Sequence, residues 1–234
     1  MFDNLGEQLQ QAIIDNDRWQ MYLEGLGVTI VMSLGAIVIG VILGTLVALV
    51  KVKAKRTKNV GIKILNVICD IYLTVIRGTP SMLQILIWFL IIFASWPMNM
   101  GVLIAIIAFG FNSGAYVAEI IRSGIQAVDR GQDEAGRSLG LSEKTTMRLI
   151  ILPQAVKNIL PALGNELIVL VKETAIVGYI AVEDLTKVAM LIQGTTYQPL
   201  VPLILSALIY LVLVVLMTFG LRKLERRLGR SDRR

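Results

Sequence analysis

The chain has 234 residues, 55% of them hydrophobic and only 17% charged, and its formal net charge is +6. This balance is more apolar than that of a water-soluble domain of this size and is typical of an integral membrane protein. Because the chain has no histidine and a single cysteine, Cys69, it lacks the usual ligands of catalytic zinc, the usual general base and any internal disulfide. Composition therefore argues against an enzyme, and we expect no catalytic, cofactor-binding or metal-binding residues on this chain.

The first apolar segment follows an acidic N-terminal segment. Residues 1–24 have no basic region leading into a short apolar core and no small-residue cleavage site, so we do not interpret them as a removable signal peptide. Residues 25–50 contain no charged residue and exceed the roughly 20 helical residues that cross a bilayer, which predicts the first transmembrane helix. Gly40 and Gly44 form a small-residue face that favours close packing of this helix against another.

A second uncharged stretch, residues 78–118, is too long for one transmembrane helix. It is interrupted at residues 95–99, Ser-Trp-Pro-Met-Asn, where an aromatic residue, a proline and an amide meet. The stretch therefore predicts parts of two helices, a second span over about 66–94 and a third over about 101–121.

The second predicted span contains Pro80, which removes one helical hydrogen bond and kinks the helix, and Gly78 beside it loosens the backbone further. Two interpretations remain open. Either the freed backbone groups line a polar cavity at membrane depth, or the motif ends a helix nearer the membrane interface.

Two further segments are candidates for spans. The fourth, about 159–182, scores poorly on hydropathy because it contains Glu166, Lys172 and Glu173, whereas the fifth, about 199–221, has no charges. Each crossing reverses the side of the membrane on which the next connection lies. Four spans and five spans therefore predict opposite locations for the C-terminus.

Basic residues decide between these alternatives. The connection after the first span carries only basic charges, and the tail after the last span is rich in arginine, so both are expected in the cytoplasm. This requires five crossings and an extracytoplasmic N-terminus. Clustering of the positive charge beside apolar segments indicates topology and argues against a nucleic-acid partner. The basic residues of the first connection are Lys51, Lys53, Lys55, Arg56, Lys58 and Lys63.

The sequence thus predicts an all-α integral membrane protein with five transmembrane helices per chain. Residues 1–24 are expected to form an extracytoplasmic N-terminal segment, residues 25–221 the transmembrane domain, and residues 222–234 a basic cytoplasmic tail.

The connection between the third and fourth spans is long for a membrane protein with short connections elsewhere, which is typical of a functional loop. Its sequence predicts a short helix, a glycine stop and a second helix, within a loop of about 129–153. Gly140 can adopt the left-handed conformation that ends a helix, and Ser142 can cap the next one. Two short helices displayed in this way form a knob that fits a groove on a partner protein.

The loop resembles the EAA loop of importer permeases in the ATP-binding-cassette (ABC) superfamily. The resemblance rests on Glu134-Ala135, Gly140, Ile150 and Leu152-Pro153 at the expected spacing. It departs at Gly136, where the family commonly has a second alanine, so the helix is expected to be weaker there. Other runs are similar to the polar amino-acid branch of the superfamily, and the resemblance covers about residues 23–221. These runs are Arg77-Gly78-Thr79-Pro80, Tyr116 to Arg122, Gly131-Gln132 and Lys172-Glu173-Thr174.

The resemblance implies a permease subunit of an ATP-driven importer in the bacterial plasma or inner membrane. Its implied partners are two ABC ATPase subunits, which hold ATP and Mg, a second permease chain, an extracytoplasmic amino-acid-binding protein and the amino-acid substrate. The chain itself has only a near match to a phosphate-binding loop, with Arg137 where lysine is required. The residues implied in coupling to the ATPase are Glu134, Ala135, Arg137, Leu139, Gly140, Leu141 and Lys144.

Rival functional classes make different predictions. A gradient-driven carrier or channel would explain spans and buried charges but leaves the cytoplasmic helix pair without a purpose. A membrane enzyme would need a nucleophile, base or metal-ligand constellation, and the sequence offers none. A passive scaffold protein would show no ligand-stimulated ATPase activity in a reconstituted complex.

Ionisable and polar residues within the spans are candidates for the substrate pathway. Arg77 either binds a substrate carboxylate or pairs with Asp70, which lies two helical turns earlier on the same face. Glu173 with Lys172 is the better candidate on the fourth span, because Thr174 and Gly178 indicate an interrupted helix. The sequence does not choose among glutamine, glutamate, histidine, arginine and cystine. The candidates are Asp70, Arg77, Thr79, Pro80, Gln84, Asn112, Glu119, Glu166, Lys172 and Glu173.

Overall fold

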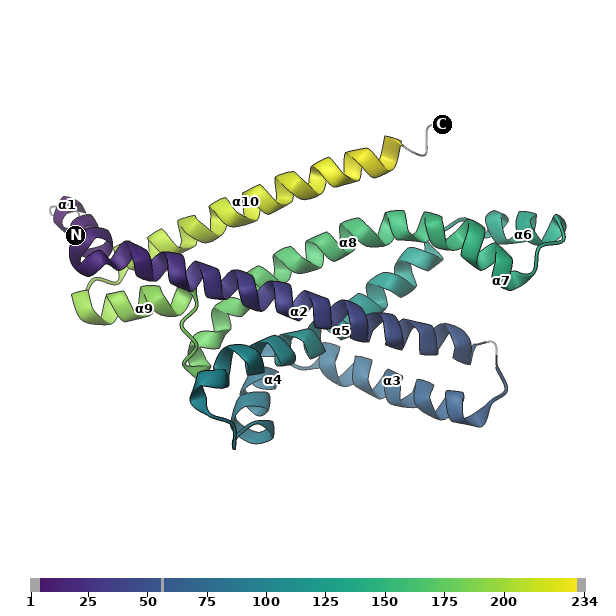
Figure 1. The fold of residues 1–234 in the computed structure, drawn as a ribbon, viewed down its shortest axis with the longest axis horizontal. Coiled ribbons are helices and arrows are strands. Elements are labelled where there is room, and N and C mark those ends of the chain that lie inside the picture. The colour runs from purple at the N-terminus through teal and green to yellow at the C-terminus, as the bar shows by residue number, and fades with distance from the viewer. Residues whose placement is uncertain (1–4, 56, 231–234) are drawn as a thin grey trace.

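A computed structural model of the chain describes residues 5–55 and 57–230, except for the side chains of residues 229 and 230. Every regular element in these residues is a helix, which confirms the predicted all-α class. The long helices run roughly along one axis, with α1 (Leu5–Leu9) and α9 (Leu185–Thr196) at one end and α6 (Arg130–Ser138) with α7 (Glu143–Thr146) at the other (Figure 1).

The centre of the fold is the packing of α2 (Arg18–Ala54) against α5 (Gly101–Gln126). Both helices extend beyond the spans expected from the uncharged runs. A Cβ atom at Gly40 would lie 2.9 Å from Ser113 Oγ, and one at Gly44 would lie 2.6 Å from Val117 Cγ1. The glycines therefore let the two backbones approach closely, as the small-residue face predicted.

The predicted second span is broken rather than merely kinked. Helix α3 (Val60–Gly78) and α4 (Ser81–Ile87), which continues as a π-helix over Trp88–Ile92, meet at an angle of 112°. Thr79 and Pro80 between them are extended, because proline cannot continue the ladder and restrains the residue before it. Gln84 stabilises the break by donating to the carbonyl oxygen of Ile76 at 2.8 Å.

The remaining elements complete the bundle. Helix α8 (Leu152–Glu173) follows the π-helix Met147–Ile151 and packs along α5. It ends in a 3₁₀-helix, Thr174–Ile180, at the interruption that Thr174 and Gly178 predicted. Helix α10 (Leu200–Arg230) continues into the basic tail. The short N-terminal elements are α1 (Leu5–Leu9), a π-helix at Gln10–Ile14 and a 3₁₀-helix at Asp15–Asp17, and another 3₁₀-helix, Met98–Met100, precedes α5.

Within the described residues, three helical segments are long and apolar enough to cross a membrane, and the bent pair α3–α4 makes a fourth if it counts as one span. They contain α2, α5 and α10. Helix α8 is not among them. Its charged residues Glu166, Lys172 and Glu173 lower its hydropathy, as the sequence predicted. Many large apolar side chains of α2 and α10 are exposed in the single chain, for example Val38 at 58% and Leu216 at 65%. Such exposure suits helices that face lipid.

Asp184 ties α9 to the bundle. Its fully buried carboxylate caps α9 by accepting hydrogen bonds from the backbone N–H groups of Thr186 and Lys187, at 3.1 and 2.9 Å, and it accepts a third from the Tyr210 hydroxyl of α10 at 3.0 Å. Leu185, the next residue, donates its backbone N–H to Thr29 Oγ1 of α2. Asp184 and Leu185 together therefore join three helices.

Burial raises the pKa of the Asp184 carboxyl above its usual value, against the opposing effect of its hydrogen bonds. The folded chain thus binds this proton more tightly than the unfolded chain does. Below the pKa of the unfolded state, Asp184 should make its full contribution to the free energy of unfolding. As the pH rises from that pKa to the higher pKa of the folded state, the contribution should fall. Thermal unfolding of Asp184→Asn, which retains the cap but cannot titrate, should lack this decline.

The matched variant Asp184→Ala removes the cap and leaves the Tyr210 hydroxyl without its acceptor. It should cost about 1 kcal/mol or more in stability at every pH. Unfolding midpoints that follow the same pH dependence in the wild type and in Asp184→Asn would contradict the assignment of this titration to Asp184.

Candidate functional site

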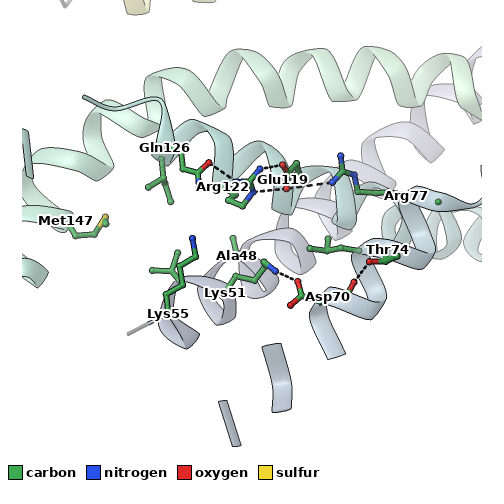
Figure 2. A pocket seen from close by; sticks show the side chains of 14 residues that line it. Ala48, Lys51, Lys55, Asp70, Thr74, Arg77, Glu119, Arg122, Gln126 and Met147 are labelled. Carbon is green, nitrogen blue, oxygen red and sulfur yellow. Dashed lines mark hydrogen bonds and ion pairs between the residues drawn. The ribbon is translucent and has the colours of Figure 1, made fainter. Parts of the chain in front are cut away.

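A charged cavity of 820 Å³ opens between α2, α3 and α5, and Met147 of the long connection also lines it (Figure 2). Figure 2 shows basic and acidic side chains projecting into it from all three helices. Its charged lining residues are Lys51, Lys55, Asp70, Arg77, Glu119 and Arg122.

The ion pairs around this cavity join different helices. Lys51 of α2 pairs with Asp70 of α3, and Arg77 Nη1 of α3 lies 3.8 Å from Glu119 Oε2 of α5. Glu119 also pairs with Arg122 one turn along α5. Of the two alternatives left open for Arg77, the pair with Asp70 is not formed, because each of these residues has a partner on another helix. The cavity therefore has both signs of charge, which suits a zwitterion.

A second group of polar side chains lies around the middle of α5. Asn112 Nδ2 donates to Gln84 Oε1 at 2.7 Å, and Gln84 Nε2 donates to Thr79 Oγ1 at 2.7 Å. The neighbouring Ser113 donates to Glu166 Oε1 of α8 at 2.8 Å. Gln84 and Asn112 are buried, with 8% and 5% of their surfaces exposed. We call these five residues the polar cluster; it brings together α4, α5, α8 and the Pro80 break.

Lys172 and Glu173 lie at the far end of α8, where Glu173 is still close enough to Glu166, two turns earlier, for the two carboxylates to interact electrostatically. The exposed Lys172 lines a groove of 380 Å³ with Thr186 and Tyr210, while Glu173 is partly buried. The predicted pathway residues thus fall into three places. The cavity is lined by Asp70, Arg77 and Glu119. The polar cluster, beside Pro80, contains Thr79, Gln84, Asn112 and Glu166. The third place is the end of α8, with Lys172 and Glu173.

Sequence reasoning did not single out three residues as part of these groups. Ser113 stands between Gly110 and Gly114, and the sequence indicates close helix packing for such a pair of glycines four residues apart. Lys51 was assigned to membrane topology alone. Arg122 lies at the end of the Tyr116 to Arg122 run, whose resemblance to the family was a usable signal.

The predicted helix-turn-helix unit is formed by α6 and α7. Gly140 has φ +77°, in the left-handed region, and Ser142 Oγ caps α7 by accepting the backbone N–H of Thr145 at 3.3 Å. Leu139, at the tip, is 80% exposed. A Cβ atom at Gly136 would lie 2.6 Å from Thr146 Cγ2, so glycine permits α6 to pack closely on α7. The weak helix-forming residue at this position therefore has a packing role.

The other residues of the unit are arranged on its surface. Arg137 Nη2 pairs with Asp133 Oδ2 at 2.8 Å across one helical turn. Glu134, Ala135, Leu139 and Lys144 are exposed, and Leu141 is partly exposed. Within the described residues, no group of three or more Cys, Asp or Glu side chains is placed to hold a metal ion.

Comparison with known proteins gives a consistent result. Residues 61–230 match the family model "Binding-protein-dependent transport system inner membrane component". The chain is 41% identical to an arginine transport system permease protein of Bacillus subtilis, over 90% of this chain and 93% of that protein. It is 33% identical to a glutamine transport system permease protein of Escherichia coli, over 89% and 93% of the two chains.

Solved structures resemble it as well. A crystal structure described as an amino acid ABC transporter with histidines has 44% identity and a TM-score of 0.80, covering 89% of this chain and 94% of that one. An inward-facing methionine ABC transporter shares the fold, with a TM-score of 0.73 at 17% identity over 92% and 99% of the two chains.

Proposed function

Because the chain belongs to the family of inner membrane components of binding-protein-dependent transport systems, as a permease subunit of an amino acid ABC importer, we propose that it carries a polar amino acid by alternating access. Family membership bears out the resemblance read from the motifs and does not favour a gradient-driven carrier. As a membrane component, the chain is distinct from the ATPase, and we assign ATP and Mg to a partner subunit.

The proposed topology has five crossings, with α8 and its 3₁₀ extension as the fourth. In support, α8 packs along α5, and Glu166, the charge nearest its middle, is hydrogen-bonded to Ser113 of α5. A charge paired inside the bundle is compatible with a transmembrane helix. This arrangement leaves the N-terminus and α9 outside, and the α6–α7 unit and the C-terminal tail in the cytoplasm, as the basic residues predict.

The observation that carries the coupling proposal is the geometry of the α6–α7 unit. The unit projects at the end of the bundle (Figure 1). Leu139, next to the left-handed Gly140 in its turn, has an exposed fraction of 80%. An exposed leucine in the turn of a projecting helix pair suits insertion into a groove of a partner. We assign the partner as an ABC ATPase, present in two copies beneath two permease chains, with an extracytoplasmic binding protein at the opposite face.

Gly140→Val tests this coupling. A β-branched residue at φ +77° is strained by about 1–2 kcal/mol or more, so the turn should open and displace α7. Amino-acid uptake by the reconstituted complex should fall about tenfold while ATP hydrolysis continues. Gly140→Asn is the matched control, since asparagine tolerates the left-handed region, and it should retain uptake. Full uptake in Gly140→Val would remove the coupling role from this turn.

The proposed pathway passes from the polar cluster to the charged cavity. The polar cluster offers amides and a carboxylate deep in the bundle, and the cavity offers both carboxylates and guanidinium groups at the cytoplasmic side. An α-amino acid has the complementary ammonium and carboxylate groups. Lys172 and Glu173, at the far end of α8, are proposed to contact the substrate on entry.

One charge inside the bundle supports a substrate class. Glu166 is the charged member of the polar cluster, which favours a cationic side chain, and the relatives named above include an arginine permease and a glutamine permease. The test is substrate-stimulated ATP hydrolysis by the reconstituted complex across the twenty amino acids. Arginine is expected to stimulate more strongly than glutamine. Stimulation restricted to acidic or apolar amino acids would contradict this proposal.

A further inference from the structure

A second groove lies at the corner where α2 ends and α3 begins, next to the charged cavity. Its volume is 380 Å³. The end of α2 and the start of α3 lie side by side here, joined by the basic connection (Figure 1). The residues that line this groove, which we call the corner groove, are Lys51, Ala54, Lys55, Lys63, Asn66 and Val67.

The corner groove has an excess of positive charge. Asp70, which lies outside it, pairs with Lys51 and accepts a hydrogen bond from Asn66 Nδ2 at 2.8 Å. Among the residues that the structure describes, Lys55 and Lys63 form no ion pair, and no carboxylate lines the groove. Two ammonium groups therefore remain available to one anion.

The surface that continues from the corner groove toward the middle of the membrane is apolar. On α3, Ile64, Ile68 and Ile71 are exposed by 57%, 56% and 59%, and Val67, also exposed, lies in the groove itself. A free phosphate or a nucleotide would gain nothing from these side chains. A phospholipid would place its phosphodiester at the lysines and its acyl chains along α3, so this combination favours a lipid.

We propose that the corner groove binds an anionic phospholipid of the cytoplasmic leaflet. The phosphodiester lies between the ammonium groups of Lys55 and Lys63, and the acyl chains lie against α3. Only the choice of leaflet rests on the topology proposed above. Because Lys51 and Lys55 also line the charged cavity, a lipid held here adjoins the proposed substrate pathway.

The test uses the complete transporter complex in nanodiscs of phosphatidylcholine mixed with phosphatidylglycerol. Native mass spectrometry counts the phosphatidylglycerol retained per permease chain as its content is varied. The double variant Lys55→Gln, Lys63→Gln is expected to bind about 30-fold more weakly, as for the loss of two basic groups at an anionic lipid. Lys53→Gln, Lys58→Gln removes the same charge from the same region, but neither residue lines the groove, and this double variant should retain the lipid.

Three outcomes would overturn the proposal. An equal loss in both double variants would mean diffuse attraction of the basic connection to an anionic surface. Glycerol phosphate that displaced the lipid at equal concentration would mean a site for free phosphate. Unchanged retention in the Lys55, Lys63 variant, with loss of permease dimers, would mean that a second copy covers α3. Lipid retention is read without transport, so it stays interpretable even if no amino acid stimulates ATP hydrolysis.

Discussion

Replacing Gly44 with leucine is expected to abolish the folded permease. A Cβ atom there would lie 2.7 Å from Val117 Cβ and 2.8 Å from the backbone nitrogen of Ala118. A backbone atom cannot move aside by changing rotamer, so α2 and α5 must separate along the centre of the bundle. Overpacking of this kind costs about 3 kcal/mol or more. Thermal unfolding in detergent and the yield of monodisperse protein measure the effect.

Gly27→Leu is the matched control in the same helix. A Cβ atom at Gly27 meets nothing within 4 Å, so the larger side chain enters open space on the exposed side of α2. Leucine also forms helices more readily than glycine, which should leave stability unchanged or slightly raised. If both variants unfolded at the same temperature as the wild type, the close packing of α2 on α5 would not stabilise the fold.

The sequence predicted the first, third and last long helices because each contains an uncharged run, and the helices extend past these runs because hydropathy does not define helix ends. The second span was harder. Pro80 predicted a kink but not a bend of 112°, at which the Gln84 side chain donates hydrogen bonds to the carbonyl oxygen of Ile76 and the hydroxyl of Thr79. No local pattern shows which backbone groups a glutamine side chain will reach.

The candidate site shows the same limit. Asp70 and Arg77 share a helix face, so the sequence indicated an ion pair between them as one alternative. In the folded chain Asp70 pairs with Lys51 of α2, and Arg77 with Glu119 of α5. Such partners are distant in sequence, and their approach is set by the packing of helices. Helical periodicity identified the charged face correctly, but only the tertiary structure identifies the partners.

Gly136 illustrates how a local rule can miss the physical reason for a residue. Judged by helix propensity, glycine weakens α6 at this point. In the structure a Cβ atom would collide with Thr146, a buried β-branched residue that cannot easily move. The turn at Gly140 was predictable because its conformation is local, whereas the contact between α6 and α7 is not.

Glu166→Gln is expected to reduce arginine-stimulated ATP hydrolysis and arginine uptake by about 30-fold or more. The change retains an oxygen that can accept the hydrogen bond of Ser113, at 2.8 Å in the wild type, but removes the negative charge of the polar cluster. Loss of one partner from a desolvated charge pair costs about 2 kcal/mol or more, which gives this factor. Stimulation by glutamine, which has no side-chain charge, should fall much less.

Ser113→Ala is the complementary variant, since it removes the hydrogen bond and leaves the carboxylate charge in place. It should weaken stimulation by arginine and glutamine to a similar extent, because the position of Glu166 changes and its charge does not. The ratio of arginine-stimulated to glutamine-stimulated ATP hydrolysis therefore distinguishes an effect of the Glu166 charge from an effect of the Glu166 position. If Glu166→Gln folds like the wild type, as judged by its unfolding midpoint, and leaves this ratio unchanged, then Glu166 does not bind the cationic side chain of the substrate.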